Sequence, residues 1–232
     1  MNWGKNYATK GLFWGTYMIE IYLFVNPLGM ECYQAEKQIL QLVDAEKSKK
    51  IQFRFVPFIN MHVVDRLIKK YHLPKNDLAW RNRLFHTLYS AALDYKALQL
   101  QGKKKGRFFL LQLQKSCGLE KQKYSPALVE SLVVKAGGDL EEFRLDRASN
   151  FVKEAFLTDQ QIAHDMSIED TPSCVVYNYS CQRDFGVLLE GDWCKDPVAL
   201  KELCQTDNLN GSVNKSFSLH HELYEKHPLH LV

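Results

Sequence analysis

Residues 18–32 read MIEIYLFVNPLGMEC, and this stretch carries the most informative pattern in the chain. The β-branched and aromatic run over residues 18–25 is typical of a buried strand, which Asn26-Pro27 ends. Helical spacing of apolar residues follows over residues 31–46, and a second strand is predicted over residues 51–58, where Pro57 stops it. A strand, a helix and a strand with short links predict a βαβ unit with parallel strands and a right-handed crossover.

The late part of the chain shows strand patterns again. Residues 173–178 and 185–190 are two strand-like runs on either side of a polar turn, and they predict an antiparallel hairpin. Asp196-Pro197 then predicts the capped start of a helix. Between about residues 60 and 166 the apolar spacing is helical, and breaks such as Ser125-Pro126 divide it into four or five predicted helices.

The predicted order is therefore β-α-β, a helical block, then β-β-α. A sheet of two strands is marginal alone, so both halves are expected to meet in one sheet. Sheets with this order resemble those of the thioredoxin superfamily, which implies an α/β, thioredoxin-like fold with a large all-helical insertion. The predicted division is a discontinuous thioredoxin-like domain at residues 1–60 and 167–205, a helical insertion at 61–166 and a C-terminal tail at 206–232, with a surface leader at 1–17.

Composition excludes several classes of protein. The chain has 232 residues, 46% hydrophobic and 25% charged, which is typical of a globular protein and not of a disordered or collagen-like chain. A net charge of +3 is too small to predict a nucleic-acid partner. No run approaches the ~20 apolar residues of a membrane span, and the start lacks the features of a signal peptide. We therefore expect a cytoplasmic protein with reduced thiols and no membrane partner.

The cysteines and histidines do not predict a metal site or a cofactor. The six cysteines are scattered, and no pair has Cys-x-x-Cys spacing, so neither a zinc ribbon nor a dithiol motif is present. For Cys174, Cys181, Cys194 and Cys204, packing is the preferred interpretation. The tail histidines, His220, His221, His227 and His230, have irregular spacing, and we expect no metal there.

Two short motifs are the places where chemistry is expected. The first is the turn over residues 26–32, where the strand passes into the helix; a helix N-terminus lowers the pKa of a thiol placed there. The second is Thr171-Pro172 at the start of the third predicted strand, because X-Pro is the ordinary site of a cis peptide bond. The predicted fold brings the two motifs together.

With these motifs in view, residues 21–32 resemble the DsbA-like thioredoxin-fold proteins, whose motif is a strand, Asp-Pro and then Cys-x-x-Cys. More closely they resemble the Firmicute YjbH/SpxH adaptors, which present the transcription factor Spx to the ClpXP protease and whose turn is much like Asp-Pro-Leu-Cys-Pro-Glu-Cys. Residues 151–156 with Asp159-Gln160, followed by Thr171-Pro172, match the last insertion helix and the cis-proline turn of that family. The resemblance covers residues 18–205 and implies an adaptor, not an enzyme, with Spx and the ClpXP protease as partners.

The departure from the family pattern is informative. Gly29 stands at the position of the attacking cysteine, and Cys32 stands at the position of the resolving one. Dithiol exchange needs both sulfurs, so we expect a redox-inactive turn with no catalytic residue. In thioredoxin-fold proteins the residue before the cis proline offers its backbone to an extended peptide. The resemblance thus implies a partner-binding surface made of Gly29, Met30, Glu31, Cys32, Thr171 and Pro172.

Other functions stay open at this stage. Cys32 is either a small buried hydrophobe or the nucleophile of a DsbA-like monothiol oxidoreductase. A relative of kappa-type glutathione transferases is a further alternative, although those proteins place a serine at the active turn and Gly29 lacks the hydroxyl. The sequence does not decide which surface binds Spx, or whether the protease is contacted directly.

Overall fold

The computed structural model describes residues 18–47, 50–74, 77–179 and 185–205. The predicted leader, the predicted tail with its histidines, and Cys181 lie outside the described residues. The division into a sheet domain, an insertion and a tail stays a prediction.

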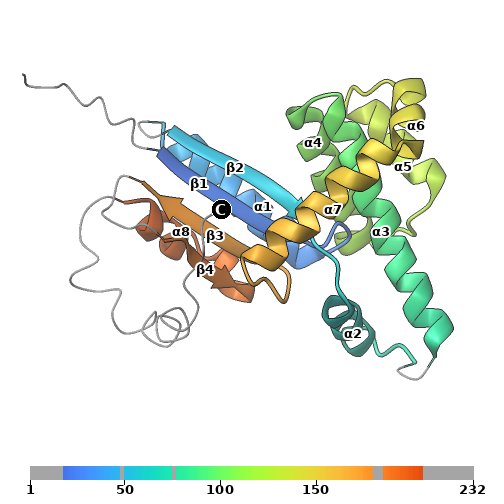
Figure 1. Cartoon of the computed structure of the whole chain (residues 1–232), viewed down its shortest axis with the longest axis horizontal. Coiled ribbons are helices and arrows are strands. Elements are labelled where there is room, and N and C mark those ends of the chain that lie inside the picture. Colours follow the sequence, from blue (N-terminus) through green and yellow to red (C-terminus); the bar gives the residue numbers. More distant parts are fainter. Residues whose placement is uncertain (1–17, 48–49, 75–76, 180–184, 206–232) are drawn as a thin grey trace, which may run out of the picture.

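The two halves of the chain meet in one four-stranded sheet (Figure 1). Strand β1 (Met18–Val25), helix α1 (Met30–Ala45) and strand β2 (Lys50–Pro57) form the predicted βαβ unit, with β1 and β2 parallel. Strand β3 (Ser173–Asn178) is antiparallel to β1 on its other side, and β4 (Val187–Glu190) is antiparallel to β3. The order β2-β1-β3-β4 confirms the predicted thioredoxin-like sheet and its late hairpin.

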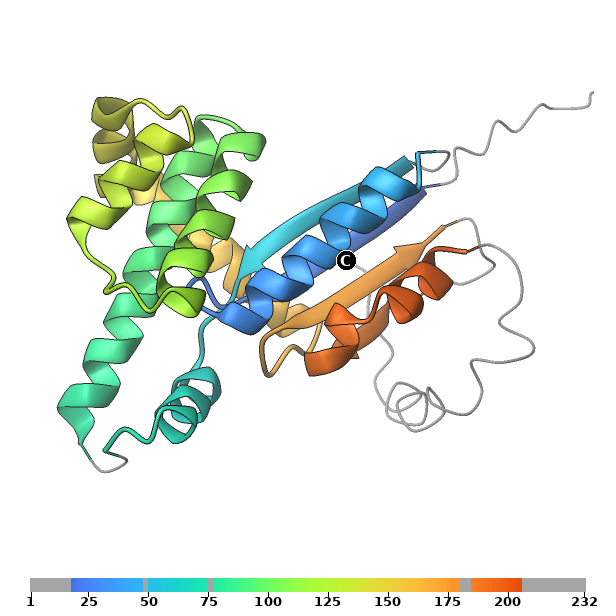
Figure 2. The ribbon, with the colours of Figure 1, turned by 180° about the vertical axis from the view of Figure 1, so that it is seen from behind.

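Helices cover the sheet unequally. Helix α1 and the last helix, α8 (Pro197–Cys204), lie on one face, as Figure 2 shows. Asp196 caps α8 as predicted, because its carboxylate accepts a hydrogen bond from the backbone N–H of Val198. A short 3-10 helix, η2 (Gly191–Lys195), joins β4 to α8.

The chain between β2 and β3 is helical, as predicted, but the number of helices was underestimated. Its described residues form α2 (Met61–Lys70), α3 (Leu78–Leu100), α4 (Lys103–Gln114), a π-helical turn η1 (Lys115–Leu119), α5 (Pro126–Lys135), α6 (Leu140–Ala148) and α7 (Asn150–Asp165). The prediction of four or five helices is therefore wrong, since six α-helices are described in this stretch. The boundary before α7 is a capping serine, Ser149, with no Gly or Pro beside it, so no break was visible in the sequence.

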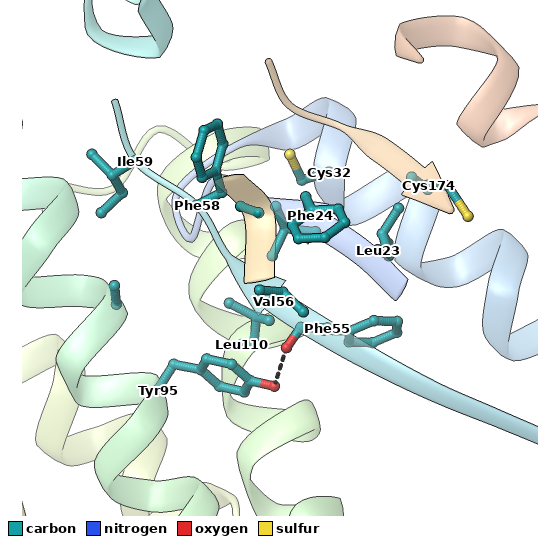
Figure 3. Close-up of a cluster of buried hydrophobic side chains, with 14 of the residues drawn as sticks. Leu23, Phe24, Cys32, Phe55, Val56, Phe58, Ile59, Tyr95, Leu110 and Cys174 are labelled. Atoms are coloured by element: carbon teal, nitrogen blue, oxygen red, sulfur yellow. Dashed lines mark hydrogen bonds between the residues drawn. The ribbon is translucent and has the colours of Figure 1, made fainter. Parts of the chain in front are cut away.

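The hydrophobic core is continuous from the sheet into the insertion. Figure 3 shows Phe55 and Val56 of β2 near Tyr95 of α3 and Leu110 of α4, and all four side chains are buried. The hydroxyl of Tyr95 donates a hydrogen bond of 3.1 Å to the carbonyl oxygen of Phe55. Helix α7 crosses the sheet on the side opposite α1, at the end where β2 stops (Figure 1).

A buried carboxylate on α7 links this helix to α3 and to β2. Asp159 is fully buried and forms ion pairs with Lys96 of α3, at 2.7 Å, and with Arg54 of β2, at 2.5 Å. The next residue, Gln160, donates to the carbonyl oxygen of Pro57 at 2.7 Å. These contacts fix the position of the insertion at the edge strand of the sheet.

Asp159→Asn is expected to lower the free energy of unfolding by about 3–5 kcal/mol, because it leaves the buried ammonium of Lys96 without its counter-charge. Urea unfolding followed by circular dichroism measures this. The control is Glu130→Gln, which weakens the exposed pair with Arg144 and is expected to cost about 0–1 kcal/mol. Equal costs for the two variants would contradict the structural role given to Asp159.

Candidate functional site

The turn between β1 and α1 is tight and is held by Asn26. The side-chain oxygen of Asn26 accepts from the backbone N–H of Leu28 at 2.9 Å, and its carbonyl oxygen accepts from Gly29 at 3.1 Å. Gly29 is the N-cap of α1 and provides no side-chain cap. A Cβ added at Gly29 would lie 3.2 Å from the sulfur of Cys32, which is closer than an ordinary contact. A side chain at position 29 would thus point at the Cys32 sulfur.

The turn and the cis-proline motif meet at Cys32. The Thr171-Pro172 peptide bond is cis, as predicted. The Thr171 side chain lowers the pKa of the Cys32 thiol, in opposition to burial, and β1 and β3 place Phe24 opposite Ser173 at the adjacent end of the sheet. The structure therefore brings together the two motifs that lie about 140 residues apart in the sequence.

Cys32 lies in the protein interior. Its side chain is 2% exposed, and its sulfur accepts a hydrogen bond from the backbone N–H of Asn26 at 3.2 Å. Burial raises the pKa of the Cys32 thiol to about 12, and the nearby Glu36 carboxylate adds to this rise. The expectation that the helix start lowers this pKa is wrong, because the cost of desolvating a thiolate exceeds the favourable effect of the helix N-terminus. The folded structure therefore disfavours ionisation of this thiol.

An ionic cluster joins α2 to the start of α1 and to the cis-proline loop. We call Glu31, Arg66, Lys70 and Asp170 the clasp. Arg66 pairs with Asp170 at 2.8 Å and faces Glu31 at 3.5 Å, and Lys70 pairs with Glu31 at 2.6 Å. The Lys70 ammonium holds the pKa of Glu31 below its usual value. Helix α2 is thus joined through charges to both motifs of the candidate site.

The clasp also engages the backbone of Thr171. Its carbonyl oxygen accepts a hydrogen bond from Arg66 Nη2 at 2.6 Å, and its N–H donates to the Asp170 carboxylate at 2.7 Å. Thr171 is 2% exposed. Both groups that an extended peptide would use at this edge are therefore occupied within the chain.

The π-helical turn η1 approaches the site from another side. A Cβ added at Gly118 would lie 2.8 Å from the backbone nitrogen of Met30, so only glycine fits against the turn without a shift. Lys121 donates to the Gly118 carbonyl oxygen at 2.6 Å, and its ammonium lies 5.6 Å from the centre of the Tyr71 ring, next to α2. The turn at Met30 is thus framed by η1 and α2. π-Helical turns often occur at functional sites.

Sequence reasoning missed Arg66, Lys70 and Gly118. The only signals were a glycine inside a helical run and two basic residues one helical turn apart. Neither signal says that the residue faces the turn over residues 26–32, because the contacts are set by the packing of distant elements.

A buried acid lies directly behind Cys32 on α1. Glu36 is fully buried, and its Oε1 accepts a hydrogen bond of 2.6 Å from Gln114, whose amide also donates to the carbonyl oxygen of Asn26. Its Oε2 has no hydrogen-bond partner among the described residues. Burial raises the pKa of the Glu36 carboxyl well above its usual range.

The described residues offer neither a metal site nor a membrane-spanning helix. Within residues 18–205, apart from the gaps stated above, no group of three or more His, Cys, Asp or Glu side chains is placed to hold a metal ion. No helix in the same part of the chain is both long and apolar enough to cross a membrane.

Cys32 is expected to resist alkylation in the folded protein. At pH 7.5 its thiolate fraction is so small that iodoacetamide should modify it at least about 100-fold more slowly than in the urea-unfolded chain. Peptide mapping by mass spectrometry measures the rate at each cysteine. Half-buried Cys117, with a pKa raised to about 11, is the internal comparison and should react first. Fast labelling of Cys32 would contradict the buried position.

Glu36→Gln is expected to make stability less dependent on pH. The pKa of Glu36 is higher in the folded state than its unfolded value of ~4.3, so its protonated form favours folding at low pH and this advantage disappears as the pH rises through the folded pKa. The variant should therefore be more stable than the unmodified protein at pH 8, with a smaller difference at pH 5. Urea unfolding at the two pH values measures this. An equal difference in the free energy of unfolding between the two proteins at pH 5 and pH 8 would show that Glu36 does not titrate as inferred.

Comparison with known proteins identifies the family. A family model described as thioredoxin matches residues 22–196. The ClpXP adapter protein SpxH of Staphylococcus saprophyticus is 30% identical over 173 residues, which cover 75% of this chain and 60% of that protein. SpxH of Bacillus subtilis is 25% identical over 202 residues, which cover 77% of this chain and 64% of that protein. This chain thus spans less than two thirds of the length of these curated relatives.

Solved structures show the same fold. A putative protein disulfide isomerase from Nitrosomonas europaea has a TM-score of 0.57 at 14% identity and covers 80% of this chain and 95% of its own. The oxidoreductase DsbA from Xylella fastidiosa has a TM-score of 0.54 at 15% identity and covers 80% of this chain and 83% of its own. At these identities the likeness concerns the fold alone, and it confirms the predicted DsbA-like arrangement. The chain therefore belongs to the thioredoxin family, in the DsbA-like form with a helical insertion, and it is a homologue of the SpxH ClpXP adapter proteins.

Proposed function

We propose that this protein is an adaptor that binds the transcription factor Spx in the cytoplasm and promotes its proteolysis by ClpXP. The observation that carries the proposal is the similarity to SpxH adapter proteins over about three quarters of the chain. An adaptor acts by raising the effective concentration of its client at the protease, which requires a binding surface and no reaction.

We infer that the protein is not an enzyme and that its turn is redox-inactive. Gly29 has no sulfur to form a mixed disulfide, and the buried Cys32 has a pKa of about 12. Both features oppose a monothiol oxidoreductase, because the attacking species is an accessible thiolate. The absence of a hydroxyl at Gly29 likewise opposes a transferase of the kappa type.

We propose that Spx contacts the surface around the turn. Gly29, Met30 and Glu31 are partly exposed there, whereas Cys32 and Thr171 support them from inside. Met30 at the first position of α1 offers a flexible apolar contact that adapts to a partner. Pro172 is also buried, and its cis peptide bond places Thr171 beside the turn.

The test is a degradation assay with purified ClpXP and Spx, with and without the full chain. We expect the chain to accelerate loss of Spx and to bind it in a pull-down. Cys32→Ser should retain both activities, whereas Thr171→Arg should weaken binding by at least about tenfold, since a long charged side chain would disturb a buried position.

Two further variants make this test decisive. Thr158→Arg lies on an exposed part of α7 and serves as the matched control that should bind Spx normally. Met30→Arg changes a partly exposed position and should weaken binding even if Thr171→Arg fails to fold. If the unmodified chain does not change the rate at which ClpXP degrades Spx, the adaptor function is contradicted. Loss of activity in Cys32→Ser would favour a thiol enzyme.

A further inference from the structure

Arg66 blocks the backbone group that a bound strand would need. Its Nη2 atom serves three acceptors at once: the Thr171 carbonyl oxygen at 2.6 Å, the Thr171 hydroxyl at 3.2 Å and the Asp170 carboxylate at 2.8 Å. Strand addition requires that this carbonyl accept a hydrogen bond from the partner's backbone. Because Thr171 is only 2% exposed, a partner that binds this edge must move the Arg66 side chain aside to reach the carbonyl oxygen.

The guanidinium of Arg66 has an unsatisfied hydrogen-bond donor in this position. Its Nε atom is buried and has no hydrogen-bond partner among the described residues. A guanidinium binds a carboxylate best through two parallel N–H groups, such as those of Nε and one terminal nitrogen. Here one terminal nitrogen carries most of the contacts while the Nε–H is left unsatisfied, at a cost in free energy.

Arg66 is also placed where it can turn outward. Its side chain is 30% exposed, and Asp170 and Glu31 are exposed to a similar degree, so solvent reaches the clasp. When Arg66 leaves, Glu31 keeps its own pair with Lys70 at 2.6 Å. Displacement of Arg66 thus breaks only the contacts with Asp170 and Thr171, together with the longer approach to Glu31.

We propose that Arg66 determines which segments bind this edge, and that it selects an extended peptide carrying an acidic side chain. A backbone N–H of the peptide donates a hydrogen bond to the Thr171 carbonyl oxygen. The peptide's carboxylate accepts hydrogen bonds from Nε and one terminal nitrogen of Arg66. A neutral segment breaks the same contacts and supplies no new carboxylate, so it binds less well. The identity of the client, Spx, rests on the proposed function. The preference for an acidic side chain rests on the contacts of the clasp.

Two variants that break the same ion pair should have opposite effects on the affinity for Spx. Asp170→Asn removes the carboxylate that holds Arg66 inward but keeps a side-chain oxygen that can accept from Thr171, so binding should become tighter by at least about threefold. Arg66→Gln opens the edge but removes the partner of the peptide carboxylate, so binding should become weaker by about tenfold. Isothermal titration calorimetry measures both affinities.

The control is Arg81→Gln, because Arg81 pairs with Asp65 and its side chain has nearly the same exposure as that of Arg66. It should bind Spx like the unmodified protein. If Arg66 only blocks the edge, both test variants bind more tightly; if the clasp only supports the fold, both bind more weakly. Either result overturns the proposal. A titration with blocked peptides needs no variant and keeps the proposal testable if Asp170→Asn is unstable.

A second experiment does not depend on Spx. The probes are the blocked peptides acetyl-Val-Glu-Val-Glu-Val-amide and acetyl-Val-Gln-Val-Gln-Val-amide, titrated into the full chain and followed by nuclear magnetic resonance. We expect the acidic peptide to shift the Thr171 amide and the Arg66 Nε–H signals and to bind at least about fivefold more tightly than the neutral one. Equal binding, or an unmoved Arg66 signal, overturns the proposal. Preferential binding of the acidic peptide without binding of Spx would instead contradict the proposed function and leave this inference standing.

Discussion

Backbone pairing along β1 is the constraint on which the rest of the molecule depends. A strand in the middle of a sheet can satisfy its N–H and C=O groups only if it has partners on both sides. β1 finds one partner, β2, directly after α1, and the other, β3, only after the whole helical insertion. The register of β1 with β3 places the cis proline beside the turn at Gly29. The candidate site is thus a consequence of the pairing of distant strands.

The insertion is positioned by buried polar contacts as well as by the shared core. Asp159, with its two cationic partners, and the hydroxyl of Tyr95 link the helices to β2, near the end of that strand. A buried ion pair contributes little net free energy, but its geometry excludes other arrangements that would leave a charge unpaired. With the insertion fixed in this way, α2 and η1 lie against the turn.

The chemistry of the turn follows from this enclosure. A thiol at a helix N-terminus in contact with water becomes more acidic, whereas the same thiol inside the core becomes less acidic. Cys32 is in the second situation, together with Glu36 one helical turn away, whose carboxyl pKa burial also raises. The surroundings of the turn therefore favour the uncharged forms of both side chains, while the charged groups of the clasp lie beside it.

Local patterns in the sequence were sufficient for the elements of the sheet, the cap at Asp196 and the cis bond before Pro172. Each of these depends on a few neighbouring residues, so a single sequence contains the necessary information. The pKa of Cys32, the clasp formed by Arg66 and the close approach of Gly118 were decided by tertiary structure. Arg66 and Thr171 are 105 residues apart, and the burial of one thiol depends on elements from both halves of the chain. Desolvation and charge pairing are properties of the assembled interior, and a local sequence pattern carries no record of which distant groups will form it.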